Sequence, residues 1–241
     1  QIGYMMMTPS STQSRREQQR QQFRSDNLKV GRRMFARGGY LYLNMDRIAE
    51  ELRRAKGTIY NHFRNKEEII LALVNETLEI RAEMFSRAAQ FRGCPRERLL
   101  AVGMAAELFV RLYPEHFSVE QVLRTSSIMD KTSEERRKIM RVCEGRCMGI
   151  VTGIVRDAVS SGDLHLPSYV TPEDLVFGLW SITFGAYSII ATSDALSEVG
   201  IRDPFTAVAH NIHHLLDGYG WRPLWNAHDY ASVLKRVEEE K

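Results

Sequence analysis

The fold is decided by the stretch Met45-Asp-Arg-Ile-Ala-Glu-Glu-Leu-Arg-Arg-Ala-Lys-Gly-Thr-Ile-Tyr-Asn-His-Phe63. It predicts two short helices joined by a turn of about four residues, which is the helix-turn-helix arrangement. Asn44 is a good N-cap for the first helix, because its side chain can accept hydrogen bonds from free backbone N–H groups. In the second helix, Ile59 and Phe63 lie four residues apart and should face inward together.

The outward face of the second helix carries side chains that suit a nucleic acid. Such a helix enters the major groove of DNA by its N-terminal end, where donors and acceptors meet phosphates and base edges. The residues left for this face are Lys56, Gly57, Thr58, Tyr60, Asn61 and His62. We therefore expect them to form a DNA-binding surface.

One further helix braces the motif on each side. Apolar residues from Phe23 onward fall at helical spacing, and Gly38-Gly39 should end that helix. Asn65 should open the helix that follows, with Glu68 completing a capping box. Lys66 would then stand at the positive end of the helix dipole, which disfavours a cation unless a phosphate docks there. Lys66 is therefore a further candidate for a phosphate contact.

Charge is segregated along the chain. The 241 residues carry a net charge of +3, but residues 1–66 hold 14 Lys and Arg against 5 Asp and Glu, and the remainder hold 19 against 25. A basic N-terminal part beside an acidic remainder indicates a polyanion as the partner of the N-terminal part. A solvated basic face would explain the same charge without a partner.

The rest of the sequence is also helical in pattern. Pro95, Pro114 and Pro204 stand at helix starts, Thr171 is an N-cap for another, and no stretch alternates as a strand does. We expect an all-α protein of about nine helices, with a short tenth at 230–239 as an option. The expected organisation is a polar basic arm at 1–22, a helix-turn-helix DNA-binding domain at 23–66, a helical ligand-binding and dimerisation domain at 67–222, and a C-terminal tail at 223–241.

Three segments together resemble the TetR family of bacterial repressors. They are Phe35-Ala-Arg-Gly-Gly-Tyr40, Ile48-Ala-Glu50 and Gly57-Thr-Ile-Tyr-Asn-His-Phe-Arg-Asn-Lys-Glu-Glu68, and the resemblance covers roughly residues 25–75. It implies an Ω-shaped all-α homodimer with two recognition helices in successive major grooves of a double-stranded DNA operator, and a separate effector-binding domain. By position, the resemblance assigns phosphate contacts to Tyr60, His62 and Lys66, and base reading to Lys56, Gly57 and Asn61.

The chain departs from the family's pattern at the turn. Arg53-Arg54-Ala55 stands where the family usually has Gly-Val-Ser. Losing the glycine predicts a turn without a positive φ, or one adopted under strain. Losing the serine removes the N-cap of the recognition helix, at a cost of about 1 kcal/mol. We hypothesise that Arg53 and Arg54 add phosphate contacts, whereas Leu43, in place of a hydroxyl residue, makes a phosphate contact before the first helix unexpected.

An arginine cluster precedes the motif. Arg15, Arg16, Arg20 and Arg24 lie in a polar, Gln-rich segment. They could enter the minor groove as an arm, or they could belong to a soluble leader. The sequence leaves these two interpretations equal.

Two apolar helices near the C-terminus suit a dimer interface. In the family, the last two core helices pair with their copies in a four-helix interface, which here places the homodimer contact on the helices near 171–192 and 203–217. A dimer also suits an operator made of two half-sites.

The helices between would frame a pocket for a small-molecule effector of unknown identity. Aromatic and Met side chains favour an apolar or amphipathic molecule, although ordinary core packing explains any one of them as well. The candidate lining residues are Phe109, Tyr113, Phe117, Met129, Met140, Trp180, Phe184 and Tyr187. The leading interpretation is a repressor whose effector shifts the dimer to a spacing that no longer fits the operator.

Two clusters suggest a metal- or redox-responsive sensor instead. They are His210, His213 and His214 with Asp217, at helical positions from which imidazoles can share a metal, and Cys143 with Cys147. Packing explains both clusters more simply, so we expect no metal site and no cofactor. A third interpretation is an architectural DNA-binding or assembly module without an effector.

Other classes of protein are disfavoured. The sequence holds no nucleophile beside a base, no acid/base pair and no Gly-rich phosphate loop that would indicate an enzyme. The three cysteines form an odd count and no apolar leader is present, so we expect a cytoplasmic protein without membrane contact. The apolar stretch 175–192 contains Ser, Thr and Gly residues and suits a buried helix better than a membrane span.

Overall fold

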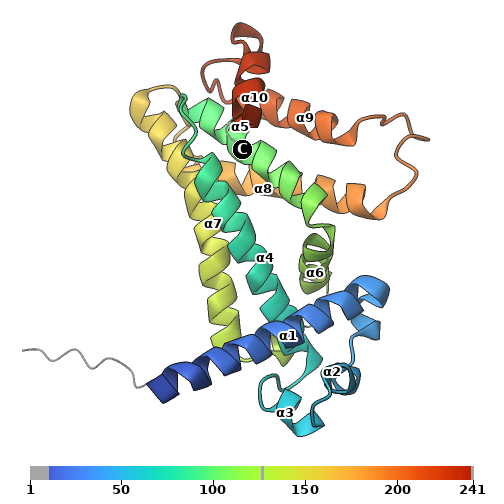
Figure 1. The fold of residues 1–241 in the computed structure, drawn as a ribbon. Coiled ribbons are helices and arrows are strands. Elements are labelled where there is room, and N and C mark those ends of the chain that lie inside the picture. Colours follow the sequence, from blue (N-terminus) through green and yellow to red (C-terminus); the bar gives the residue numbers. More distant parts are fainter. Residues whose placement is uncertain (1–10, 126–127, 240–241) are drawn as a thin grey trace, which may run out of the picture.

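The computed structural model describes residues 11–125 and 128–239, and within them it contains helices and loops but no strand, which confirms the all-α prediction. The helices are drawn in Figure 1. Their bounds are α1 (Ser11–Tyr42), α2 (Met45–Glu51), α3 (Lys56–Tyr60), α4 (Lys66–Ala88), α5 (Pro95–Leu112), α6 (Pro114–Thr125), α7 (Glu134–Ser161), α8 (Pro172–Thr192), α9 (Pro204–Gly218) and α10 (Tyr230–Glu239), with 3-10 turns η1 (Met129–Lys131) and η2 (Trp225–Ala227).

The molecule consists of a lower and an upper part that two long helices connect. In Figure 1, α1, α2 and α3 form the lower part, and α5, α8, α9 and α10 lie in the upper part. The helices α4 and α7 pack side by side and run between the two parts (Figure 1). The helices α4 and α7 therefore join the upper part directly to the helix-turn-helix.

The helix-turn-helix begins where its caps predict. The Asn44 side chain accepts two backbone N–H bonds at the start of α2, and the Asn65 side chain accepts one from Glu68, at 2.9 Å, at the start of α4. The expected capping box is wrong in one detail, because the Glu68 carboxylate accepts the backbone N–H of Arg64, at 3.1 Å, rather than that of Asn65.

One apolar core joins the lower part to α4, α6 and α7. Ile48, Ile59 and Phe63 are fully buried, and they share a cluster with Ile69 of α4 and Val119 of α6. The packing thus continues past residue 66, where we expected the first domain to end. The first half of α4 belongs physically to the helix-turn-helix unit.

The first helix differs most from expectation. It begins at Ser11, well before the predicted start at Phe23, so the segment expected as an arm is helical over 11–22, and residues 1–10 lie outside the described part of the chain. Gly38 and Gly39 leave the helical conformation, as predicted, and Gly39 adopts a φ of 65° that favours glycine.

The helices of the upper part begin and end at the residues that the sequence indicated. Thr171 caps α8 and Asp203 caps α9, each through its side chain, and Gly162 ends α7 with a φ of 80°. The helix from Pro114 is shorter than expected, since it stops at Thr125 and η1 follows. The optional tenth helix is present as α10, which packs on the side of α5.

Candidate DNA-binding surface and effector pocket

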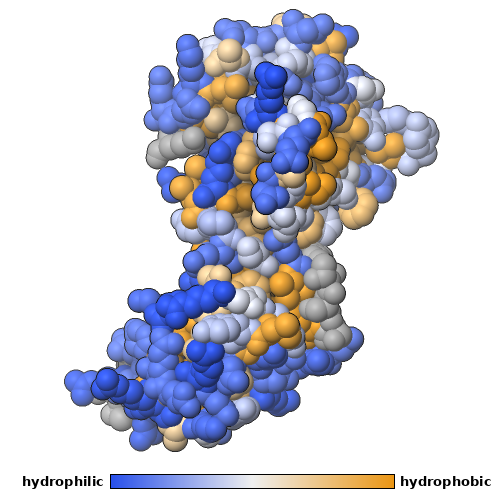
Figure 2. Space-filling view, turned by 90° about the vertical axis from the view of Figure 1, so that its right-hand side faces the viewer, coloured by the Kyte–Doolittle hydropathy of each residue, from blue (hydrophilic) through white to orange (hydrophobic). Residues whose placement is uncertain are grey.

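Helix α3 presents the expected polar face. Ile59 and Phe63 point into the core, and the exposed residues are Lys56, Gly57, Thr58, Tyr60 and Asn61. A Cβ atom added at Gly57 would meet no other group within 4 Å, so the backbone is accessible there. Figure 2 shows that the surface of the lower part of the molecule, which contains this helix, is mainly hydrophilic. Apolar patches lie on the upper part and where the two parts join.

His62 stands at the edge of this face. Its ring is half-buried, with its centroid 4.7 Å from that of Phe23 in α1. Burial lowers the pKa of His62, and the positive charge of Arg20 lowers it further. A neutral imidazole still donates one N–H bond, which is what a phosphate contact requires.

Lys66 is already engaged within the chain. Its Nζ donates to the backbone carbonyl of Tyr40, at 3.1 Å, and lies 3.9 Å from the centroid of the Tyr40 ring. The carbonyl offsets the cost of placing a cation at the start of α4. A phosphate bound by Lys66 would add to this arrangement or replace part of it.

Lys56 ties α3 to α2. Its Nζ lies 2.6 Å from the Asp46 carboxylate, and this hydrogen bond and charge raise the pKa of Lys56. Both side chains are exposed, so the pair is weak and a DNA acceptor can take the place of Asp46.

The turn between the two helices carries both costs that its sequence suggested. Arg53 has a φ of 49°, and it is the one non-glycine among the described residues with a positive φ, so the turn is adopted under strain. Ala55 occupies the N-cap of α3 and makes no side-chain hydrogen bond. Arg54 is exposed, with its guanidinium 6.0 Å from the Phe23 ring centroid.

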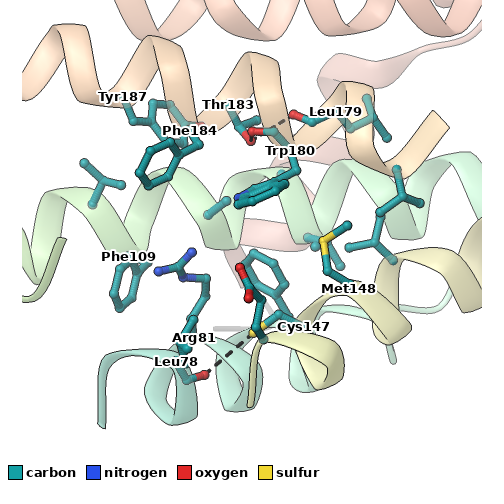
Figure 3. Close-up of a pocket in the computed structure, with 18 of the residues that line it drawn as sticks. Leu78, Arg81, Phe109, Cys147, Met148, Leu179, Trp180, Thr183, Phe184 and Tyr187 are labelled. Atoms are coloured by element: carbon teal, nitrogen blue, oxygen red, sulfur yellow. Dashed lines mark hydrogen bonds between the residues drawn. The ribbon is translucent and has the colours of Figure 1, made fainter. Parts of the chain in front are cut away.

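A cavity of about 130 Å³ lies in the upper part, where α4 to α9 meet (Figure 3). Its wall is mainly apolar. Five of the eight predicted effector-binding residues line it, namely Phe109, Phe117, Trp180, Phe184 and Tyr187. The side chains of Trp180 and Phe184 from α8 point toward those of α4, α5 and α7 in Figure 3.

The structure places the other three predicted lining residues outside this cavity. Met140 is buried in the core that joins the helix-turn-helix to α4, and Met129 packs against it. Tyr113 lines a separate groove of about 410 Å³ between α4, α5 and α10, which also contains Leu112 and Val237. Tyr113 also packs against Phe109, with ring centroids 5.6 Å apart, so it lies behind the cavity wall, whereas the two methionines belong to the other core.

The sequence interpretation missed a charged pair in the cavity wall. Arg81 of α4 donates to Glu120 of α6 through both terminal nitrogens, with an Nη1–Oε1 distance of 3.3 Å. The side chains are only 12% and 2% exposed, so the pair is desolvated. In Figure 3 Arg81 points into the cavity, and its guanidinium lies 4.9 Å from the Phe109 ring centroid.

A sequence signal for Arg81 exists. It lies three residues after Leu78 and four before Phe85, so it shares their helix face, and all three line the cavity. A cation inside an apolar helix face indicates either an ion pair or a ligand site.

The histidines and the acid that suggested a metal site do not converge. The His213 ring stacks on Trp225, with centroids 3.6 Å apart, and Asp217 pairs with buried Arg96, with an Nη2–Oδ1 distance of 2.6 Å. His210 and His214 are exposed on α9. Across residues 11–125 and 128–239 no group of three or more His, Cys, Asp or Glu side chains is arranged to hold a metal ion.

The two cysteines of α7 also have a structural explanation. Cys147 lies in the cavity wall, 3.7 Å from the Leu78 carbonyl, and burial raises the pKa of its thiol to about 11. Burial raises the pKa of Cys143 as well. Protonated thiols are poor metal ligands and poor nucleophiles, so the pair does not suit a redox or metal sensor.

Known proteins are similar to the chain in both sequence and fold. The sequence profile of bacterial regulatory proteins of the tetR family matches residues 28–73. The fatty acid metabolism regulator protein of Bacillus subtilis (strain 168) is 25% identical over 177 residues, which span 69% of this chain and 87% of that protein.

Solved structures show the same fold. A tetR-family regulatory protein from Rhodococcus RHA1 superimposes with a TM-score of 0.63 at 20% identity, covering 82% of this chain and 97% of that one. A fatty acid degradation regulator from Bacillus halodurans superimposes with a TM-score of 0.60 at 16% identity, covering 80% of this chain and 96% of that one. At this level of identity the likeness concerns the fold.

Proposed function

Because this chain belongs to the TetR family of bacterial transcriptional regulators, we propose that it is a cytoplasmic, dimeric repressor that a fatty-acid-derived effector releases from its DNA operator. It is a regulator and not an enzyme. The DNA-binding surface is the exposed face of α3, with Tyr60, His62 and Lys66 as phosphate contacts and Lys56, Gly57, Thr58 and Asn61 facing the bases.

The apolar cavity in the upper part supports the effector part of this proposal. Its wall is built from aliphatic and aromatic side chains, with the Arg81–Glu120 pair as its desolvated charged element. Each methylene group of an acyl chain buried there contributes about 0.8 kcal/mol. The carbonyl or carboxylate head of the same molecule can accept hydrogen bonds from Arg81.

The relative from Bacillus subtilis supports the chemical class. It is a regulator of fatty acid metabolism by name, and the alignment with it spans 69% of this chain. An amphipathic acyl compound therefore agrees with both the relative and the composition of the cavity wall.

The exposed side of α8 supports a homodimer. This helix is long and apolar enough to cross a membrane, but only 22% of its apolar window is buried within the single chain, so our expectation of a buried helix is wrong for the monomer. Phe177, Ser181, Gly185 and Ile189 follow one another at intervals of four and share one face. Phe177 and Ile189 are 59% and 57% exposed, and pairing with a second copy through α8 and α9 would cover them.

Two helices connect the cavity to the recognition helix. Glu120 of α6 is paired with Arg81 of α4 in the cavity wall, and the neighbouring Val119 packs in the core of the helix-turn-helix. At the start of α7, Arg136 donates to the carbonyl of His62, at 3.1 Å, and its Nε lies 3.4 Å from the Glu68 carboxylate. An effector whose polar head group binds Arg81 would break the Arg81–Glu120 ion pair. The loss of this pair would move α6 relative to α4 and shift the recognition helix.

Filling the cavity tests the effector site. Ala106 lines the cavity, and the adjacent Ala105 lines the separate groove, so they sit on different faces of α5. The operator is first selected from genomic fragments with the purified protein. Fatty acids and acyl thioesters of increasing chain length are then titrated into the protein–operator complex.

We expect release of the operator to strengthen with chain length until the cavity is full. Ala106→Phe should keep operator binding and lose release, whereas Ala105→Phe should respond like the wild type. Release that is equal in both variants would place the effector outside the cavity. An operator complex that no acyl compound dissociates would refute the fatty-acid effector.

The DNA-binding surface has its own test. Tyr60→Ala and Lys66→Ala should each weaken operator binding, and in Lys66→Ala, which removes a positive charge, the slope of log affinity against log salt should also fall by about 0.9. The double variant Arg53→Ala/Arg54→Ala tests the contacts proposed for the turn, and an unchanged slope would remove that hypothesis.

A further inference from the structure

The N-terminal half of α1 projects beyond the helix-turn-helix unit. The family profile begins at residue 28, whereas α1 begins at Ser11. From Ser11 to Phe23 the helix is about 18 Å long. Every residue from 15 to 22 is exposed, and Figure 1 shows this end of α1 at the level of the lower part, beside α3.

Contacts with the helix-turn-helix fix the direction of this projection. The centroid of the Phe23 ring lies 4.7 Å from that of the His62 ring and 6.0 Å from the central carbon of the Arg54 guanidinium. One turn later, the buried Asn27 side chain donates to the Phe23 carbonyl, at 2.7 Å. The projecting segment therefore starts beside the C-terminal end of the recognition helix.

The face of α1 that meets the recognition helix continues as a basic stripe. Counting back from Asn27, the positions Phe23, Arg20 and Arg16 follow at intervals of four, three and four, which keeps them on one side of the helix. The effect of the Arg20 charge on the pKa of His62 agrees with this placement. Arg24 stands four residues after Arg20, closer to the body of the molecule, and its charge acts on Glu76 and Arg136.

We propose that this segment is a second DNA contact, in which Arg16 and Arg20 bind backbone phosphates beside the base pairs that α3 reads. The inference rests on the proposed DNA binding by α3, because that contact sets where α1 lies on the duplex. DNA is the partner that fits, since the stripe is basic and continuous with the recognition surface.

Because the segment is helical, its width indicates which part of the DNA it can contact. An α-helix with side chains is about 10–12 Å wide, whereas the minor groove is about 6 Å wide, so the segment does not enter the minor groove as an arm. Arginine side chains on one face can instead reach phosphates along the groove edge. At about 3.4 Å per base pair, a segment about 18 Å long spans about five base pairs.

The test compares two double variants that remove the same charge. Arg16→Ala/Arg20→Ala removes the stripe, and Arg92→Ala/Lys235→Ala removes two exposed cations from the opposite end of the molecule. Alanine is the best helix former, so α1 should stay folded, which circular dichroism checks. Binding of the operator and of a scrambled duplex is measured over a series of salt concentrations, and hydroxyl-radical footprints are recorded on the operator.

We expect the stripe variant to weaken both duplexes by the same factor and to lower the salt slope by up to about 0.9 for each phosphate that Arg16 or Arg20 binds in the wild type. Its footprint should lose protection at the few base pairs next to each half-site that Arg16 and Arg20 reach, while the half-site itself stays protected. The control variant should match the wild type. A stripe variant with the slope and footprint of the control would overturn the proposal.

The same data separate this inference from the proposed function. If α3 does not read DNA, the wild type shows no half-site footprint and Tyr60→Ala changes nothing. If α3 reads DNA and the segment does not touch it, the half-site footprint is present and the stripe variant leaves it unaltered. Only loss of the adjacent protection supports the second contact.

Discussion

At the scale of single residues, the start of the recognition helix α3 lacks two features that usually stabilise a helix start: a relaxed turn before it and a side-chain cap. Arg53 adopts a left-handed backbone conformation, and Ala55 leaves the first N–H groups of α3 without a side-chain cap. The helix that follows has only five residues. Its position depends on Ile59 and Phe63 in the core more than on its own hydrogen bonds.

We expect Ala55→Ser to stabilise the protein by about 1 kcal/mol, because the serine hydroxyl would accept an N–H bond from the first turn of α3. The backbone of Ala55, with a φ of −63° and a ψ of 141°, already has the extended conformation of an N-cap. Urea unfolding measures the change. Ala55→Val, which offers no acceptor, should give no gain, and an equal gain in both variants would contradict the capping explanation.

A buried histidine on α9 makes the stability depend on pH. Burial lowers the pKa of His213 from 6.5 to about 4, and the nearby charges of Arg96, His210 and His214 add to this, while Asp217 opposes it. Folded His213 stays neutral as the pH falls below 6.5, whereas unfolded His213 takes up a proton. The stability should therefore fall by on the order of 2 kcal/mol between about pH 7 and about pH 5.

Two matched substitutions check this prediction. His213→Gln removes one titrating group and should reduce the dependence of unfolding free energy on pH, although it also loses the stacking on Trp225. His210→Gln, at an exposed position on the same helix, should leave the dependence unchanged. Equal slopes in both variants would assign the effect to other groups, of which buried His116, with a pKa of about 4, is one.

At the scale of helices, Arg136 is the contact through which α7 holds the helix-turn-helix. It binds His62 and Glu68, and its guanidinium lies 4.7 Å from the Phe63 ring centroid. We expect Arg136→Met to reduce the ratio of operator affinities measured without and with effector by about tenfold, which corresponds to about 1.4 kcal/mol of coupling. Effector affinity alone should change less.

The neighbouring Arg141 provides the control. It lies on the same helix and pairs with exposed Glu134, so Arg141→Met removes an equal charge without touching the helix-turn-helix. Operator binding is measured by fluorescence anisotropy with and without the acyl compound. If Arg136→Met leaves the ratio of operator affinities without and with effector unchanged, the effector and the operator are coupled through α4 and α6 instead.

The starts of the helices could be predicted from sequence because they depend on neighbouring residues. Asn44, Asn65 and Thr171 cap the helices that follow them, as local chemistry requires. Residues 11–22 carry no such signal, since a polar segment rich in Gln and Arg without apolar periodicity has the composition of a disordered arm.

The contents of the cavity could be predicted only in part. Phe109, Phe117 and the aromatic residues of α8 lie there because apolar stripes point inward. The Arg81–Glu120 pair joins residues 39 positions apart, and no local pattern shows that two helices bring them together. Met129 and Met140 have the same apolar character as the lining residues but face the other core.

At the scale of the whole molecule, the exposed face of α8 is the surface through which we propose that the dimer forms. We expect Ile189→Glu to weaken dimerisation by about 10²-fold or more, because a carboxylate buried without a partner costs about 3 kcal/mol. Operator binding should fall with it, since a monomer contacts a single half-site. Analytical ultracentrifugation measures the dimer. Tyr169→Glu, at a position 84% exposed just before α8, should leave the dimer intact, and a dimer equally stable in Ile189→Glu would move the interface elsewhere.

The length of α4 has a mechanical consequence. Arg81 in the cavity wall and Lys66 at the start of the helix are separated by about 22 Å along a rigid rod. A tilt of about 5° around the cavity displaces the far end by about 2 Å, and two-fold symmetry doubles the change in separation to about 4 Å. Successive major grooves recur about every 34–36 Å. A change of about 4 Å in the separation of the two recognition helices would therefore move them out of register with the grooves. An effector that tilts α4 at the cavity by a few degrees would therefore be enough, in the proposed dimer, to release the operator.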